Sequence, residues 1–150
     1  MGYSTEGIYP TILTERATAD LPQSGASNQY ALFTITGNVE ILLLRGEVTT
    51  AIELQDCDLA IESNPTVGSG DTVADDVDIS DDAVGVLYTV SGVFGASLFK
   101  SDTGAIEGQT SPFTLAAGTL DLLTSADNTG KVKWIVLWKP VSIGATLVAA

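Results

Sequence analysis

The feature that most constrains the fold is an alternation of apolar and polar side chains with a period of two, without a sustained helical period. It is clearest in Gly130–Pro140, where Val132, Trp134, Val136 and Trp138 share one parity. Elsewhere, short runs rich in Val, Ile, Thr, Leu and aromatic residues are separated by clusters of Gly, Ser, Asn, Asp and Pro. This rhythm is typical of an all-β protein.

These runs predict one domain of short strands joined by turns. The "TGN" of Thr36–Asn38, for example, has the residues of a tight hairpin. Strand order is not readable from sequence, so we predict a single antiparallel β-sandwich or jelly roll, or a small β-barrel. Residues 1–28 are assigned to an extended N-terminal arm and loop, and residues 29–150 to the sandwich or barrel domain. The predicted strands are Leu13–Ala17, Gln29–Thr36, Val39–Val48, Ile52–Ile61, Val84–Thr89, Val93–Phe99, Thr119–Thr124, Val132–Lys139 and Thr146–Val148.

The charge is strongly negative, with 19 acidic residues against 6 basic residues and a formal net charge of −13. Such a field repels phosphate groups, so we expect neither a nucleic acid nor a membrane surface as a partner. The first residues lack the basic and apolar regions of a signal peptide, and no apolar run is long enough to span a membrane. We therefore expect synthesis and folding in a cytosol.

Two predicted strands, Val39–Val48 and Val132–Lys139, are apolar on both faces in their middle. A half-exposed antiparallel strand should be apolar on one face only. Either a loop covers the second face or another subunit contacts it. The residues that we predict at such an interface are Leu42, Leu44, Ile135 and Leu137.

The run Ile52–Ile61 changes parity between Leu54 and Cys57. A β-bulge near Gln55–Asp56 would return its apolar residues to one face. Cys57, the only cysteine, then points inward as a small buried hydrophobe and not as a nucleophile.

No residue constellation indicates a chemistry. The chain has no histidine, which removes Ser-His-Asp and Cys-His catalysis and most zinc and copper sites. It also lacks a glycine-rich phosphate-binding motif. We therefore expect no enzymatic activity, no catalytic residue, no cofactor and no metal.

The acidic run Asp71–Asp82 holds six carboxylates in twelve residues. An EF-hand loop starting at Asp76 fails, because Asp81 stands where the motif requires glycine and Leu87 where it requires glutamate. The run is interpreted as a solvated acidic loop, with a loose divalent-cation site or a glycosidase-type carboxylate pair as alternatives. Its spacing also suits a strand with Val77 and Ile79 inward.

Trp134 and Trp138 lie four residues apart on one strand face. Sugar-binding modules present such tryptophans on a sheet, but a platform needs polar partners. Since this face otherwise carries Val132 and Val136, the spacing favours core packing over a carbohydrate site.

Several segments resemble small virion proteins of tailed bacteriophages. The main ones are Gly118–Ala150, with the frame "GTLDL…TGKVKW…PVSIGATLVAA", and Tyr30–Glu53. The segments "NPTVGSGDTV" and "GVLYTVSG" extend the likeness over most of the chain from about residue 28. At 150 residues, the size fits the head decoration or cement proteins of such phages better than a major capsid protein.

The resemblance implies a structural role and supplies no catalytic residues. Proteins of this kind sit as β-rich homotrimers on the outer surface of the capsid, contact the major capsid protein and bridge neighbouring capsomers. The N-terminal arm would attach by adding to a sheet edge of the partner. A frayed terminus is the alternative for this segment, and a carbohydrate- or receptor-binding module of a phage tail or cell surface is the alternative function. The arm residues predicted to make the contact are Tyr3, Ile8, Tyr9 and Ile12.

Overall fold

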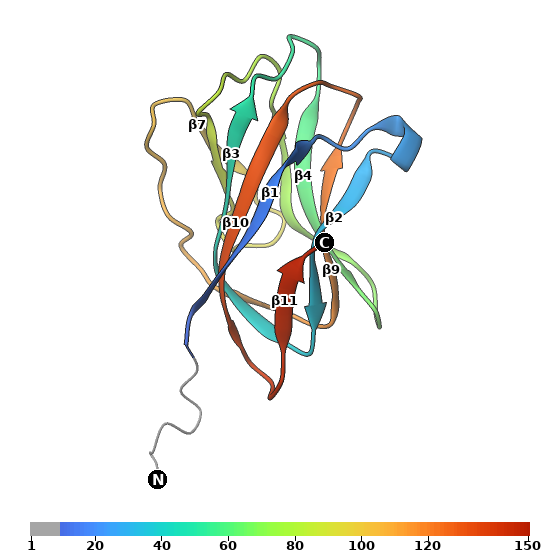
Figure 1. The fold of residues 1–150 in the computed structure, drawn as a ribbon, viewed down its shortest axis with the longest axis vertical. Helices are drawn as coiled ribbons and strands as arrows, with labels where there is room; N and C mark the ends of the chain where they lie inside the picture. The colour runs from blue at the N-terminus through green and yellow to red at the C-terminus, as the bar shows by residue number, and fades with distance from the viewer. Residues whose placement is uncertain (1–9) are drawn as a thin grey trace.

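The computed structural model describes residues 10–150, which form two antiparallel β-sheets packed face to face (Figure 1). The only helical element in this range is a single 3-10 turn, Ser24–Ala26. The predicted antiparallel β-sandwich is confirmed, and across the described residues the sheets do not close into a barrel.

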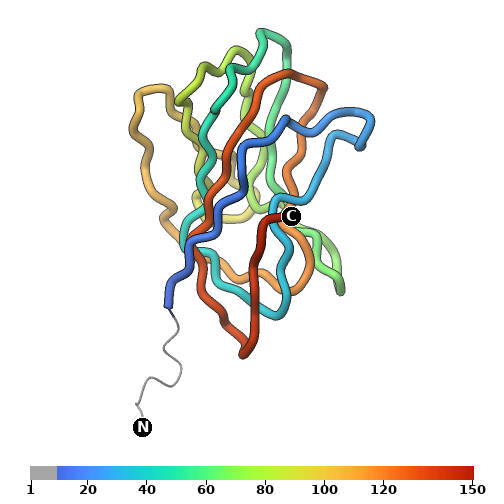
Figure 2. The backbone as a smooth tube through the Cα atoms, viewed as in Figure 1, coloured from blue at the N-terminus to red at the C-terminus, as the bar shows by residue number. Residues whose placement is uncertain are grey.

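Sheet A is built around two long central strands, β3 (Val39–Thr50) and β10 (Lys131–Pro140), which pair with each other along most of their length. Figure 2 shows the edge strand β1 (Ile12–Asp20) running beside β10. A short strand, β8 (Phe113–Leu115), pairs with the first residues of β3. In spatial order the sheet contains β1 (Ile12–Asp20), β10 (Lys131–Pro140), β3 (Val39–Thr50), β6 (Leu87–Thr89) and β7 (Phe99–Ser101).

Sheet B packs against sheet A and is also entirely antiparallel. In spatial order it contains β11 (Thr146–Ala149), β2 (Gln29–Thr36), β9 (Gly118–Thr124), β4 (Asp58–Pro65) and β5 (Asp71–Asp78). The segment that we assigned to an N-terminal arm thus contributes β1 to sheet A.

The core lies between the sheets and follows the period-two pattern. In β10 the buried side chains are Val132, Trp134, Val136 and Trp138, with Trp134 fully buried. The predicted inward orientation of both tryptophans is confirmed. Cys57 is buried as well, and this burial raises the pKa of its thiol.

A β-bulge in β3 changes which of its leucines face the core. Leu137 of β10 lies opposite Leu43, whereas the next residue, Trp138, lies opposite Ile41. The extra residue, Leu42, reverses the parity of the strand, as a bulge does. Ile41 and Leu44 therefore both have 0% exposure. The prediction that Leu44 lies at an interface is wrong for this reason.

Other predicted elements also differ from the structure. The predicted strand Val93–Phe99 is a loop as far as Leu98, and of the predicted strand Val84–Thr89 only β6 is a strand. Residues 51–57 form a loop instead of a bulged strand, and β4 begins only at Asp58. Leu54 is 82% exposed on this loop, while Ile52 is buried. The acidic run Asp71–Asp82 was interpreted as a loop, but its first eight residues form the edge strand β5, and Ile79 after them is buried as expected.

Candidate functional site

The outer face of sheet A carries an apolar row across three strands. Leu13 of β1 lies opposite Leu137 of β10, which lies opposite Leu43 of β3. Directly opposed residues point to the same side of a sheet. Leu13 is 59% exposed, and the other two leucines are half-buried. No layer of residues 10–150 fully covers this row. Of the residues predicted at an interface, the row contains only Leu137.

A second row beside it combines charge with an aliphatic side chain. Glu15 of β1 lies opposite Ile135, which lies opposite Arg45 of β3. Glu15 forms an ion pair with Lys133, with 3.1 Å between Oε2 and Nζ. Arg45 forms no ion pair with any acid of residues 10–150, and its buried Nε has no hydrogen-bond partner there. These residues surround a hollow of about 290 Å³ with Leu13, Gly46, Glu47 and Leu87.

Charge is segregated between the two sheets. All six basic residues lie on strands of sheet A, at positions 16, 45, 100, 131, 133 and 139. The strands of sheet B have no basic residue. Sheet A is therefore the less negative surface of this acidic molecule. The acids of sheet B are Asp58, Glu62, Asp71, Asp75, Asp76, Asp78 and Asp121.

One end of the sandwich carries no charged residue in its turns. We call it the uncharged end; it consists of residues 37–38, 66–70, 92–96, 116–117 and 141–145. Strand pairing brings these turns together: Pro140 lies opposite Val39, and Pro65 lies opposite Gly118. The turns after β2, β4 and β10 lie at the lower end in Figure 1, where β1 also begins.

The uncharged end is also apolar at its surface. Ile143 is 92% exposed and Val67 is 87% exposed. Phe94 packs edge-on against Phe113, with ring centroids 5.3 Å apart, and remains 38% exposed. Phe94 and Val67 line one hollow of about 220 Å³ with Pro65. Exposed apolar side chains on turns without charge are typical of a contact surface.

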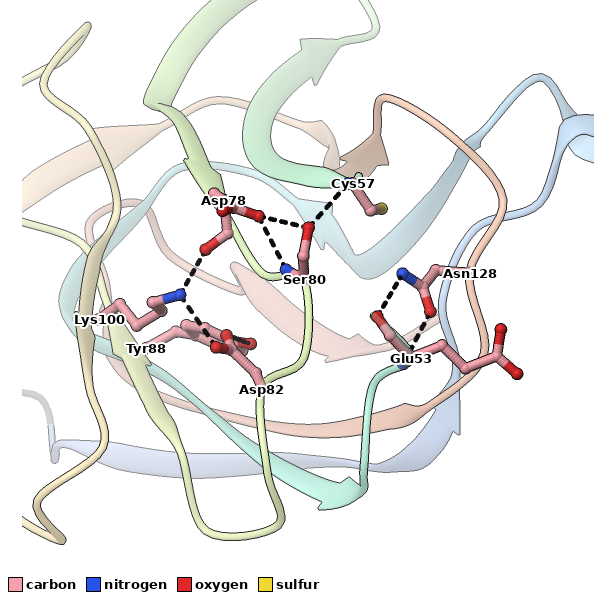
Figure 3. Close-up of polar contacts among 8 residues, drawn as sticks. All are labelled: Glu53, Cys57, Asp78, Ser80, Asp82, Tyr88, Lys100 and Asn128. Atoms are coloured by element: carbon pink, nitrogen blue, oxygen red, sulfur yellow. Dashed lines mark hydrogen bonds and ion pairs between the residues drawn. The ribbon is translucent and has the colours of Figure 1, made fainter. Parts of the chain in front are cut away.

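The opposite end is acidic, and buried polar contacts hold its loops (Figure 3). The Asn128 side chain accepts a hydrogen bond from the Glu53 N–H at 3.0 Å and donates to the carbonyl oxygens of Glu53 and Gln55. Leu54 is exposed at this end too, but the loops of this end also carry acids and no base. The acids in these loops are Glu53, Asp56, Asp81, Asp82 and Asp127.

Asp82 forms the centre of a second buried network at this end (Figure 3). The Tyr88 hydroxyl donates to Oδ2 at 2.6 Å, and Lys100 Nζ lies 2.9 Å from Oδ1. Lys100 also donates to the carbonyl oxygen of Asp78. Burial, and then the hydrogen bond with Asp82, raises the pKa of Tyr88. Both carboxylate oxygens are thus occupied by partners of the chain, and the network ties β6 and β7 to the turn after β5.

The acidic run has the geometry of a charged edge strand. Within residues 10–150 no three acidic, histidine or cysteine side chains gather closely enough to hold a metal ion. Charges on an edge strand oppose pairing with another sheet.

The two tryptophans cannot form the aromatic platform that the carbohydrate hypothesis requires, because Trp134 is 0% and Trp138 only 4% exposed.

The predicted interface residues are only partly brought together. Ile135 and Leu137 lie on the outer face of sheet A, Leu42 is the half-buried bulge residue, and Leu44 is in the core. Ile12 pairs with Trp138 and packs partly against the core. Tyr3, Ile8 and Tyr9 lie outside the described residues.

Sequence reasoning missed Leu13, Glu15, Leu43 and Arg45 on sheet A, and Ile143 at the uncharged end. The first four depend on strand pairing, which the sequence does not show. A signal for the uncharged end was present, since the turns between the predicted strands differ plainly in charge.

Across residues 10–150 no helix has the length and hydropathy of a membrane span. No protein-family model matches the chain, and a search of the curated proteins also finds no match.

Proposed function

We propose that this protein is a structural component of a phage virion that attaches to the outer surface of the capsid. It contacts the major capsid protein and, as a homo-oligomer, stabilises the shell by bridging neighbouring capsomers. The resemblance in sequence suggests this role.

The uncharged end is the observation that carries the proposal. Because this molecule has a net charge of −13, most of its surface repels an acidic surface of a partner. Turns without charge, which expose Ile143 and Val67, avoid this repulsion and offer apolar area. β1 begins at this end, so the first described residues of the chain lie beside the same surface.

The role needs no catalytic group, because a clamp stabilises a shell through contact area alone. The acidic strands of sheet B suit a surface that faces away from DNA, since carboxylates repel phosphates.

Co-sedimentation with purified shells of the same phage, prepared without this protein, tests the proposal. Ile143→Asp should weaken attachment about tenfold or more, because a carboxylate replaces a contacting apolar side chain. Leu54→Asp is the matched control: it changes a similarly exposed residue at the opposite end and should leave attachment unchanged. Equal binding by both variants, or equal loss, would contradict the assignment of this end.

Deleting residues 1–9 tests the predicted arm. This deletion ends before β1 and so keeps the pairing of Ile12 with Trp138. We expect an unchanged thermal unfolding midpoint and loss of attachment. Full attachment by the shortened chain would refute a role for Tyr3, Ile8 and Tyr9.

A further inference from the structure

The outer face of sheet A has a symmetric arrangement about its central strand, β10. In the first row a leucine stands on each side of Leu137: Leu13 on β1 and Leu43 on β3. In the second row Ile135 stands between an acid, Glu15, and a base, Arg45. If β1 and β3 exchanged places, the first row would still have a leucine on each side of Leu137. In the second row, the exchange would put a base where the acid stands and an acid where the base stands.

We propose that a second copy of this chain packs on the outer face of sheet A, around a twofold axis that runs along β10. The axis places β10 on β10 and lays β1 of each copy over β3 of the other. Leu137 and Ile135 then meet their own counterparts, and Leu13 of one copy meets Leu43 of the other. Glu15 of each copy meets Arg45 of the other, giving two equivalent ion pairs. This inference rests on the proposed function only for its premise that the protein is a homo-oligomer.

The distribution of charge indicates that the molecule bound to the outer face of sheet A is a second copy of this chain. Two molecules of charge −13 repel each other, so they can associate only where local charge is balanced or complementary. Strands β4, β5 and β9 of sheet B carry acids and no base, so a twofold contact over these strands would bring like charges together. The face of sheet A supplies Arg45, which has no acidic partner among residues 10–150, and a second copy brings Glu15 to it.

Three lysines of β10 share the outer face with Ile135 and Leu137, and each approaches its own counterpart across the axis: Lys131, Lys133 and Lys139. Lys133 forms an ion pair with Glu15 at 3.1 Å and lies opposite Glu47 on β3. Lys131 lies 3.5 Å from Asp20, and Lys139 lies 4.0 Å from Glu40. Each lysine therefore has an acidic partner within its own copy.

The contact is small, which predicts weak association. Three strands of about ten residues, at ~3.3 Å per residue and ~4.8 Å between strands, cover roughly 500 Å² per copy. The total of roughly 1,000 Å² lies at the lower limit of specific interfaces. The pair should therefore form and dissociate reversibly with concentration. A trimer, which the resemblance implies, would not use this twofold contact.

Sedimentation equilibrium of the full chain, over a range of concentrations, tests the inference. The wild type should approach twice its monomer mass of 15.5 kDa as the concentration rises. Glu15→Arg and Arg45→Glu should each weaken association at least tenfold, because each places like charges together. The double variant E15R/R45E should restore association, since the exchanged charges again meet their opposites.

Asp71→Arg is the matched control. It makes the same change of charge at an exposed acid of β5, which lies in sheet B and outside the proposed contact. It should leave association unchanged, and circular dichroism should show each variant folded. A monomer at all concentrations, a trimer, or a double variant no better than the single variants would overturn the twofold pairing.

Shell attachment separates this inference from the proposed function. If the wild-type protein binds shells but stays monomeric in sedimentation, the twofold contact is rejected and the capsid role is kept. Intact pairing without any shell binding would reject the capsid role alone.

Discussion

At the scale of single residues, Trp134 is the centre of the core. Its indole is fully buried, and it stacks with Tyr88 at 6.2 Å between ring centroids and 23° between planes. Gly46 lies opposite it on β3 and leaves room for the ring. Trp134 therefore fills the space between the sheets where the two longest strands of sheet A meet.

Trp134→Ala should lower the free energy of unfolding by about 3–5 kcal/mol, because it removes buried apolar surface and leaves a cavity. Urea unfolding followed by circular dichroism measures this directly. A loss below about 1 kcal/mol would contradict the core position of the ring.

Gly46→Ala tests the same contact from the other side. A Cβ at residue 46 would lie 2.9 Å from ring carbons of Trp134, which is too close for two carbon atoms. The ring cannot move away freely in a packed core, so we expect a loss of about 1–3 kcal/mol. The exposed Gly25, where an added Cβ has no neighbour within 4 Å, is the control. Equal stability of the two alanine variants would show that the ring has room.

At the scale of elements, the bulge of β3 depends on one glutamine. β6 pairs with residues 45–47 and β8 with residues 39–41, so the stretch between them lacks a paired strand on that side. The Gln109 side chain fills this place: its Oε1 accepts from the Leu44 N–H and its Nε2 donates to the Ile41 carbonyl oxygen, each at 3.1 Å. The loop before β8 is thereby joined to β3.

Gln109→Ala should destabilise the fold by about 1–3 kcal/mol, because it leaves partly buried backbone groups without partners. Gln55→Ala removes a single exposed hydrogen bond, to Asp127, and should cost less than 1 kcal/mol, at about the level of surface changes. Thermal unfolding of both variants provides the comparison, and a smaller effect at Gln109 than at Gln55 would contradict this bridging role.

The acidic edge of sheet B contains two aspartates with opposite pKa shifts. Burial, and then the carboxylates of Asp76, Asp78 and Asp56, raises the pKa of Asp58. Hydrogen bonds from Ser80 lower the pKa of Asp78. Ionisation of Asp58 therefore opposes folding above its folded pKa, whereas ionisation of Asp78 favours folding above its unfolded pKa.

Asp58→Asn should raise the free energy of unfolding at pH 7, and this gain should vanish as the pH falls through the folded pKa of Asp58. Asp78→Asn should lower it at pH 7, and that loss should diminish as the pH falls toward the folded pKa of Asp78. Urea unfolding at pH 7 and pH 3 measures both differences. Effects of the same sign at pH 7 would contradict the opposite shifts.

The elements could be predicted from sequence where one face of a strand is buried. The alternation in β10 and the turn after β2 were sufficient for these strands, because their register is fixed by the core. The position of the bulge was not readable, since it depends on the pairing of β3 with β10 and on Gln109, 65 residues away from Leu44. This is why Leu44 was wrongly placed at the surface and Leu43 was missed.

At the scale of the whole molecule, the main property is the separation of charge. Sheet A holds every basic residue, sheet B is acidic, and one end has turns without charge. The sequence predicted an acidic molecule with more apolar surface than one core requires. It could not predict where these surfaces lie, because the turns that form the uncharged end come from five separate parts of the chain.

Electron microscopy of shells with and without this protein tests the central claim most directly. Shells purified without it are incubated with an excess of the full chain, and the two reconstructions are compared. The account predicts added density on the outer surface only, into which the sandwich fits with its uncharged end against the shell. Identical reconstructions, or density on the inner wall, would contradict the proposed role.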